Sequence, residues 1–269
     1  MAKSQVSEQR HQAKKRFGQN FLVDGNIINR IIRAIAPLPG QHLVEIGPGL
    51  GALTSHLVDK ECSLDVVEID RDLAEKLEAK YAESPGFQLH LIDALRADFG
   101  SFARPDVPLR IIGNLPYNIS TPLLFHLLAY KENISDMHFM LQREVVDRLA
   151  SPEGKKTYGR LSIMVQYHCH VEPLFVVPPS AFRPAPKVES AIVRLRPRTR
   201  AVTANDPGFF SQVVNVCFQQ RRKTIRNGLK SMLKELPLNG LSEFDLNRRP
   251  ETFSVDEFVA IANALSALR

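Results

Sequence analysis

A glycine-rich turn and a later acidic residue carry the spacing of a nucleotide-binding site. The apolar run His42–Gly47 leads into the turn Gly47–Gly51, and Glu68 ends the next apolar run about 20 residues further on. Glycine lets a backbone turn tightly and approach a ligand, and the helix that follows presents free N–H groups. A carboxylate at that distance can accept hydrogen bonds from both ribose hydroxyls of an adenosine. We therefore expect an adenosine-containing cofactor at this turn.

The residues around the turn favour S-adenosylmethionine over a dinucleotide. The dinucleotide pattern G-x-G-x-x-G needs a third glycine, whereas Ala52 and Leu53 follow Gly51. Glu45, an acidic residue just before the first glycine, suits a positively charged sulfonium better than a pyrophosphate. Asp93 ends the third strand-like run, where it either accepts a hydrogen bond from an adenine amino group or caps the next helix.

The segment Asn114-Leu115-Pro116-Tyr117 resembles the Asn/Asp-x-Pro-Tyr signature of the N6-adenine methyltransferases. The amino group of adenine is a poor nucleophile because its lone pair is delocalised into the ring. The Asn114 side-chain oxygen and the Leu115 backbone carbonyl can accept its two N–H groups and shift the nitrogen towards a tetrahedral form. Pro116 stiffens the loop, and Tyr117 offers a ring on which a flipped base can stack. The methyl donor is already activated as a sulfonium, so we expect no metal.

Longer segments resemble the small-subunit (16S) rRNA adenine N6,N6-dimethyltransferase family, and the resemblance covers essentially the whole chain. They are FGQNFL (17–22), EIGPGLGALT (45–54), NLPYNIST (114–121), DMHFMLQREVVDRLA (136–150) and PPSAFRPAPKVESAIVRL (178–195). The resemblance implies methyl transfer from S-adenosylmethionine to two adjacent adenines near the 3′ end of that rRNA, with a role in small-subunit biogenesis. It also implies a set of cofactor contacts: Asn20, Leu22, Gly47, Glu68, Asp93 and Asn114. From the same resemblance, Phe182 is the second aromatic wall that holds adenine against Tyr117.

Strand-like runs alternate with helical patterns from residue 24 to about 196, which predicts a Rossmann-like α/β methyltransferase fold with a mostly parallel sheet. The last two runs, His170–Val177 and Val188–Arg196, are joined by a proline-rich loop, so we expect an antiparallel hairpin at the sheet edge. Residues beyond about 205 show helical patterns only. We therefore predict a catalytic domain over residues 1–200 and a small all-helical RNA-docking domain over residues 201–269.

The chain is basic, with a formal net charge of +6 and a pI of about 9.3, which favours an anionic partner such as RNA. Basic clusters occur at Lys14–Arg16 and at alternate positions over Arg194–Arg200. Our candidates for binding RNA phosphates are Arg221, Arg222, Lys223 and Arg248. No apolar run is long enough to cross a membrane, and three widely spaced cysteines are typical of a reducing cytoplasm. We expect a monomer that binds the small ribosomal subunit through its 16S rRNA.

Two other functions fit part of this pattern. Large-subunit rRNA adenine N6-methyltransferases resemble the chain in the catalytic motif and the general fold, although PPSAFRPAPKVES and LQREVVDRLA look more like the small-subunit enzymes. A non-catalytic assembly factor would keep a methyltransferase fold only to bind RNA, but intact Glu68, Asn114 and Tyr117 favour catalysis. A nicotinamide-dependent dehydrogenase does not fit, because the third glycine is missing.

Overall fold

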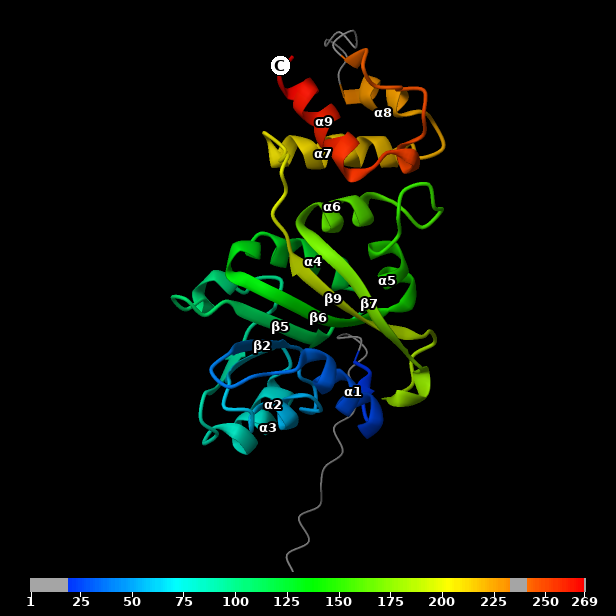
Figure 1. Cartoon of the computed structure of the whole chain (residues 1–269). Coiled ribbons are helices and arrows are strands. Elements are labelled where there is room, and N and C mark those ends of the chain that lie inside the picture. The colour runs from blue at the N-terminus through cyan, green and yellow to red at the C-terminus, as the bar shows by residue number, and fades with distance from the viewer. Residues whose placement is uncertain (1–18, 233–240, 269) are drawn as a thin grey trace, which may run out of the picture.

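A seven-stranded sheet forms the centre of the molecule in a computed structural model that describes residues 19–232 and 241–268 (Figure 1). The strands lie in the order β4-β3-β2-β5-β6-β9-β7. Their bounds are β2 His42–Ile46, β3 Ser63–Glu68, β4 Phe87–Leu91, β5 Leu109–Asn114, β6 Ile134–Gln142, β7 Cys169–Val177 and β9 Ser190–Pro197. Strands β2 to β6 are parallel, and β9 pairs antiparallel with both β6 and β7. The predicted α/β fold with an antiparallel edge hairpin is confirmed.

Helices cover both faces of the sheet. They are α1 Gly25–Ile35, α2 Thr54–Leu57, α3 Arg71–Tyr81, α4 Ser120–Leu128, α5 Arg143–Leu149 and α6 Arg160–His168. Residues of α1, α2 and α3 form one buried cluster with one face of the sheet, and residues of α4, α5 and α6 form another with the opposite face. Successive side chains of a strand point to opposite faces, so Leu43 belongs to the first cluster and Val44 to the second.

Two aspartates begin helices next to the predicted cofactor site. Asp24 accepts the N–H groups of Asn26 and Ile27 at 2.9 and 3.1 Å and so caps α1. Asp70 caps α3 directly after β3 ends. Both caps agree with the sequence prediction. The helix predicted near Leu50–Leu57 is shorter, because the glycine turn continues to residue 53 and regular helix begins at Thr54.

Shorter elements connect these layers. Two-residue strands β1 Phe21–Leu22 and β8 Phe182–Arg183 pair antiparallel beside the main sheet, with Leu22 opposite Phe182. The 3-10 helices are η2 Phe99–Phe102, η3 Lys131–Asn133, η4 Pro179–Ala181 and η6 Pro250–Thr252. The sequence patterns did not predict α5 and α6. Helix α6 has no polar face to reveal it, because it is buried between the sheet and the C-terminal helices.

The C-terminal residues form the predicted helical part, with α7 Pro207–Gln219, α8 Ile225–Met232 and α9 Val255–Ser266 grouped at the top of Figure 1. Their buried cluster also includes Tyr158, Ile163, Met164 and Tyr167, which lie in or just before α6. The helical part therefore shares a hydrophobic core with the sheet domain, and the boundary at residue 200 stays a prediction. Within residues 19–232 and 241–268, no helix is long and apolar enough to cross a membrane.

Candidate active site

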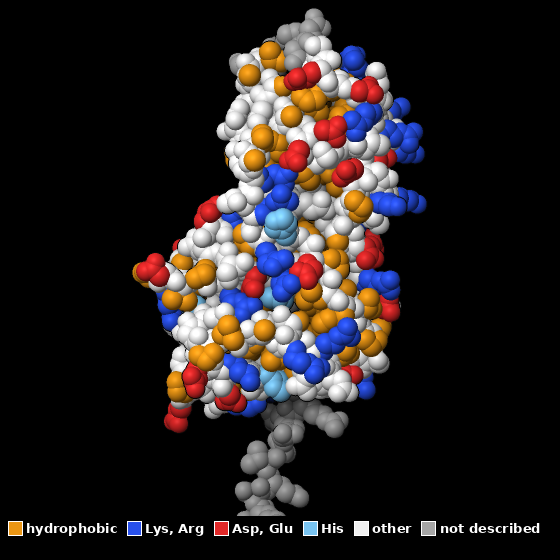
Figure 2. Space-filling view, viewed as in Figure 1, with side chains coloured by type: hydrophobic (Ala, Val, Ile, Leu, Met, Phe, Trp, Pro, Cys, Tyr) orange, Lys and Arg blue, Asp and Glu red, His pale blue; other side chains and the backbone are white. Residues whose placement is uncertain are grey.

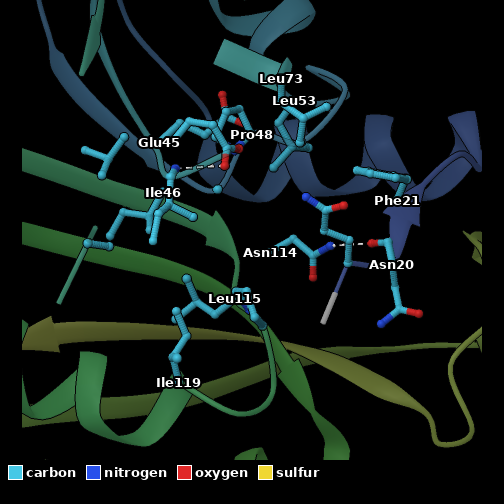
Figure 3. Close-up of a pocket in the computed structure, with 18 of the residues that line it drawn as sticks. Asn20, Phe21, Glu45, Ile46, Pro48, Leu53, Leu73, Asn114, Leu115 and Ile119 are labelled. Atoms are coloured by element: carbon cyan, nitrogen blue, oxygen red, sulfur yellow. Dashed lines mark hydrogen bonds between the residues drawn. The ribbon is translucent and has the colours of Figure 1, made fainter. Parts of the chain in front are cut away.

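The glycine turn lies between β2 and α2 and forms one wall of a pocket (Figure 3). Gly47, Gly49 and Gly51 have φ angles of +66°, +60° and +81°, which residues with a Cβ rarely adopt. A Cβ on Gly49 would lie 3.1 Å from Phe21 Cδ1, and one on Gly51 would lie 3.0 Å from Leu77 Cδ2. The turn therefore needs glycine for its backbone conformation and for close packing, and it leaves a smooth backbone wall towards the pocket.

The pocket has a volume of about 230 Å³ and collects residues that are far apart in the sequence. Every predicted cofactor contact lines it: Asn20, Leu22, Gly47, Glu68, Asp93 and Asn114. The rest of the predicted catalytic segment, Leu115, Pro116 and Tyr117, lines it as well. These residues meet because the carboxyl ends of β2, β3, β4 and β5 lie at the same edge of the parallel sheet.

Two carboxylates at this edge are held by backbone N–H groups. Glu68 Oε1 accepts the N–H groups of Ile69 and Asp70 at 2.9 and 2.8 Å. Burial raises the pKa of the Glu68 carboxyl, although these backbone hydrogen bonds lower it. Asp93 Oδ1 accepts the Leu95 N–H at 2.9 Å, so Asp93 caps a turn while it also lines the pocket. Both carboxylates are thereby held in fixed orientations next to the glycine turn.

A third carboxylate, Glu45, lies deeper in the same pocket and is only 2% exposed. Its Oε2 accepts a hydrogen bond from Thr54 Oγ1 at 2.7 Å. Burial raises the pKa of Glu45 to about 7, and the charge of nearby Glu68 also raises it. The sequence analysis singled out Glu45 but missed Thr54, the first residue of α2, whose role only the fold reveals. The site thus contains a buried acid that a nearby positive charge would ionise.

The Asn114 side chain has a defined orientation at the end of β5. Its Nδ2 donates a hydrogen bond to the Asn20 backbone carbonyl at 3.1 Å (Figure 3). This bond assigns the nitrogen and the oxygen of the amide, so Oδ1 is the atom left to accept a hydrogen bond from a ligand. The strand before it is tightly packed, since a Cβ on Gly113 would lie 2.5 Å from the Ile46 carbonyl oxygen. Asn114 is therefore a fixed acceptor in the pocket wall.

The rest of the catalytic segment is anchored to neighbouring strands. The Leu115 N–H donates to the Met140 carbonyl at 3.2 Å. The Leu115 carbonyl accepts no hydrogen bond from the part of the chain that the structure describes. The Tyr117 hydroxyl lies 2.8 Å from Ser190 Oγ on β9, a contact that no sequence pattern predicted. The loop thus presents a second acceptor, the Leu115 carbonyl, beside an aromatic ring held by its hydroxyl.

Phe182 is the one predicted catalytic residue that does not line this pocket. Its side chain is 1% exposed and belongs to the buried cluster on the α1 face. Its strand partner Leu22 does line the pocket, so Phe182 lies one residue away from the pocket wall. In this arrangement the ring has no face available for a base, and stacking on Phe182 requires it to become exposed.

The predicted RNA-binding residues differ in how free their charges are. Arg222 and Lys223 are exposed beside α8, on the side where Figure 2 shows Lys and Arg side chains gathered. Arg221 donates to the Lys156 carbonyl at 2.6 Å, and Arg248 Nη1 lies 2.6 Å from Glu257 Oε1. Arg222 and Lys223 are therefore the stronger candidates for phosphate contacts.

The other two basic clusters have different outcomes. In the cluster over Arg194–Arg200, Arg194 forms an ion pair with Glu172 at 2.6 Å, and Arg200 forms one with Asp256. These arginines are partly neutralised within the protein. The cluster at Lys14–Arg16 lies outside the described residues.

A parallel sheet with this strand order, a glycine turn with acidic residues after it, and an Asn-Leu-Pro-Tyr loop in one pocket define a Rossmann-like methyltransferase. The family described as ribosomal RNA adenine dimethylase matches residues 10–266 of the chain. The chain belongs to this ribosomal RNA adenine dimethylase family, and it is therefore an rRNA adenine methyltransferase.

Relatives are similar over almost their whole length. Ribosomal RNA small subunit methyltransferase A of Saccharophagus degradans is 55% identical over 258 residues, which cover 96% of each chain. The protein of the same name in Pseudomonas aeruginosa is 53% identical over 259 residues, again 96% of each chain.

Two solved structures share the fold. A dimethyladenosine transferase from Plasmodium falciparum has a TM-score of 0.75 at 24% identity, over 91% of this chain and 96% of that one. The 23S rRNA methyltransferase ErmE has a TM-score of 0.69 at 25% identity, over 92% of this chain and 100% of that one.

Proposed function

We propose that this protein transfers methyl groups from S-adenosylmethionine to N6 of two adjacent adenines near the 3′ end of 16S rRNA, forming N6,N6-dimethyladenosine. The observation that carries the proposal is the Asn114 amide. Its nitrogen is bound to the Asn20 carbonyl, so its oxygen is the acceptor that faces the pocket. The small-subunit relatives at 53–55% identity support 16S rRNA as the substrate.

The pocket fits S-adenosylmethionine. The glycine turn leaves room that a Cβ would fill, and Glu68 and Asp93 offer carboxylates for ribose hydroxyls and the adenine amino group. Glu45 offers a buried carboxyl towards a positive charge. When bound, S-adenosylmethionine supplies a methyl group already activated on a sulfonium. The protein then needs to orient the amine and exclude water, and we propose that it does so without a metal.

The catalytic loop would prepare the adenine amine through its two acceptors. Asn114 Oδ1 and the Leu115 carbonyl accept the two N–H groups, which directs the nitrogen lone pair out of the ring plane towards the methyl donor. Pro116 limits the backbone freedom of the loop. Tyr117, held through Ser190, provides the face on which the flipped base stacks. Phe182 would provide the opposite face after a rearrangement that exposes its ring.

The partners and location follow from the same proposal. Arg222 and Lys223 would bind rRNA phosphates of the small subunit, with Arg221 and Arg248 in supporting positions. We propose that the protein acts as a monomer in the cytoplasm. Its three cysteines are free and buried, which is consistent with a reducing compartment.

The test is transfer of labelled methyl groups from S-adenosylmethionine to small ribosomal subunits that lack adenine dimethylation. Large subunits and the Asn114→Ala variant are assayed in parallel, and labelled nucleosides are separated by chromatography. We expect N6,N6-dimethyladenosine only with small subunits and only with the intact protein. Label in large subunits would instead assign the protein to the 23S-type enzymes. Binding to the small subunit without any transfer would assign it a role in assembly alone.

A further inference from the structure

One buried histidine has no role in the site described so far. His138 lies on β6, and only 3% of it is exposed. Neither of its ring nitrogens has a hydrogen-bond partner within residues 19–232 and 241–268. Native proteins nearly always satisfy such buried atoms with a protein group or an ordered water, because leaving them unsatisfied costs free energy. The position of the ring therefore indicates what satisfies it.

The neighbours of His138 define the two sides of its ring. Residues two apart on a strand share a face, so Asp136, His138 and Met140 point to the same side of β6. Nδ1 lies 3.6 Å from Asp136 Oδ1, which is beyond hydrogen-bond distance. Asp136 is already bound by Arg110, through Nε at 3.0 Å and Nη2 at 2.9 Å. One side of the ring thus adjoins a complete ion pair, and the other side adjoins Met140.

A small cavity beside this ring reaches the catalytic loop. Its lining residues are Ile31, Ile35, Leu53, Gly113, Asn114, His138, Met140 and Ile192. Its volume of about 10 Å³ is close to the space that one water molecule needs. Asn114 pairs with Met140 in the sheet and lines both this cavity and the larger pocket. The side chains of His138 and Asn114 are the polar ones in an otherwise apolar lining.

We propose that this cavity holds one ordered water that bridges His138 and Asn114, which makes His138 a positioning residue for methyl transfer. A neutral imidazole offers one donor and one acceptor, and a water molecule can pair with either. The water supports Asn114 from behind, while the Asn20 carbonyl holds its Nδ2. Asn114 is then restrained from two directions, and its Oδ1 stays aimed at the amine. This role rests on the proposed function of the pocket.

The structural test is a crystal structure of the wild-type protein at a resolution that shows ordered water. We expect a water within hydrogen-bond distance of a His138 ring nitrogen and of Asn114. An empty or fully apolar cavity would overturn the proposal. This readout does not depend on activity, so it judges the bridging water even if the wild-type protein transfers no methyl group, an outcome that would refute the proposed function instead.

The kinetic test compares His138→Phe, which fills the space without a polar atom, with His138→Gln, which keeps a donor and an acceptor. We expect His138→Phe to lower kcat about tenfold with KM values within about twofold of wild type, the effect of losing one hydrogen bond. His138→Gln should retain most of the wild-type kcat. Unchanged kcat in His138→Phe, or equal losses in both variants, would show that the polar atoms of His138 do not position Asn114.

The matched control is Tyr158→Phe, which removes another buried hydroxyl without a hydrogen-bond partner among the described residues. Tyr158 belongs to the cluster of the helical part, away from Asn114. We expect Tyr158→Phe to keep wild-type kcat. A loss equal to that of His138→Phe would mean that kcat responds to any buried polar deletion, and this would also overturn the proposal.

Discussion

The buried carboxyl of Glu45 predicts a specific dependence of stability on pH. In the folded protein, burial raises the pKa of this carboxyl from 4.5 to about 7. The folded state therefore binds the proton more tightly than the unfolded state. The contribution to stability is complete below pH 4.5 and is lost as the pH rises through about 7. This difference in pKa corresponds to about 3 kcal/mol in the free energy of unfolding.

The variant Glu45→Gln removes this titration and keeps an oxygen that can accept the Thr54 hydroxyl. The other titrating groups are common to both proteins, so the difference between variant and wild type isolates Glu45. We expect the variant to gain about 3 kcal/mol relative to wild type between pH 4.5 and pH 8. Urea unfolding of the ligand-free proteins across this range measures it. Parallel pH curves for the two proteins would refute the reasoning.

The same carboxyl should make cofactor binding sensitive to pH. A sulfonium near Glu45 favours the ionised form, so wild-type affinity for S-adenosylmethionine should fall as the pH drops below about 7. S-adenosylhomocysteine, which has no sulfonium charge, serves as the matched ligand and should show a smaller change. Calorimetric titrations at several pH values compare them. The same slope for both ligands would contradict a direct effect of the sulfonium.

Three further predictions concern packing, the buried ion pair and RNA. Gly113→Ala should destabilise the protein by about 1–3 kcal/mol in urea unfolding, because its Cβ would lie 2.5 Å from the Ile46 carbonyl oxygen; wild-type stability would contradict this. Arg110→Met should cost about 3–5 kcal/mol in the same assay, because it leaves buried Asp136 unpaired, and a much smaller loss would show that Asp136 is solvated. A double charge reversal at Arg222 and Lys223 should weaken rRNA binding and reduce the slope of log affinity against log salt by about 1.4–1.8, and an unchanged slope would exclude these phosphate contacts.

The sequence predicted the parallel sheet, the edge hairpin and the tail helices because each has a clear hydrophobic period and clear end signals. Asp24 and Asp70 are such signals, and both cap helices as expected. Helix α6 lacks these signals because it is buried on both sides. Its apolar residues follow no single face, so only the packed structure reveals the helix.

The site residues could be predicted where a short motif carries the chemistry, as in the glycine turn and the Asn114 loop. The partners that orient these residues could not. Thr54 binds Glu45 and Ser190 binds Tyr117, but each pair meets only after the chain folds. The same limit applies to charge: Arg248 looks free in the sequence, yet its guanidinium lies against Glu257. A sequence motif shows which groups are present, and the fold decides which are already engaged.

The hydrophobic core shared by α6 and the C-terminal helices has a consequence for target choice. Tyr158 and Tyr167 pack with Phe210 and Phe258 in one continuous cluster, so the helical part cannot swing freely against the sheet. The span between the basic residues beside α8 and the Asn114 loop is then a constant of the folded chain. A nucleotide is modified only if it lies that far from the docked phosphates, and the protein selects its adenines by length as well as by chemistry.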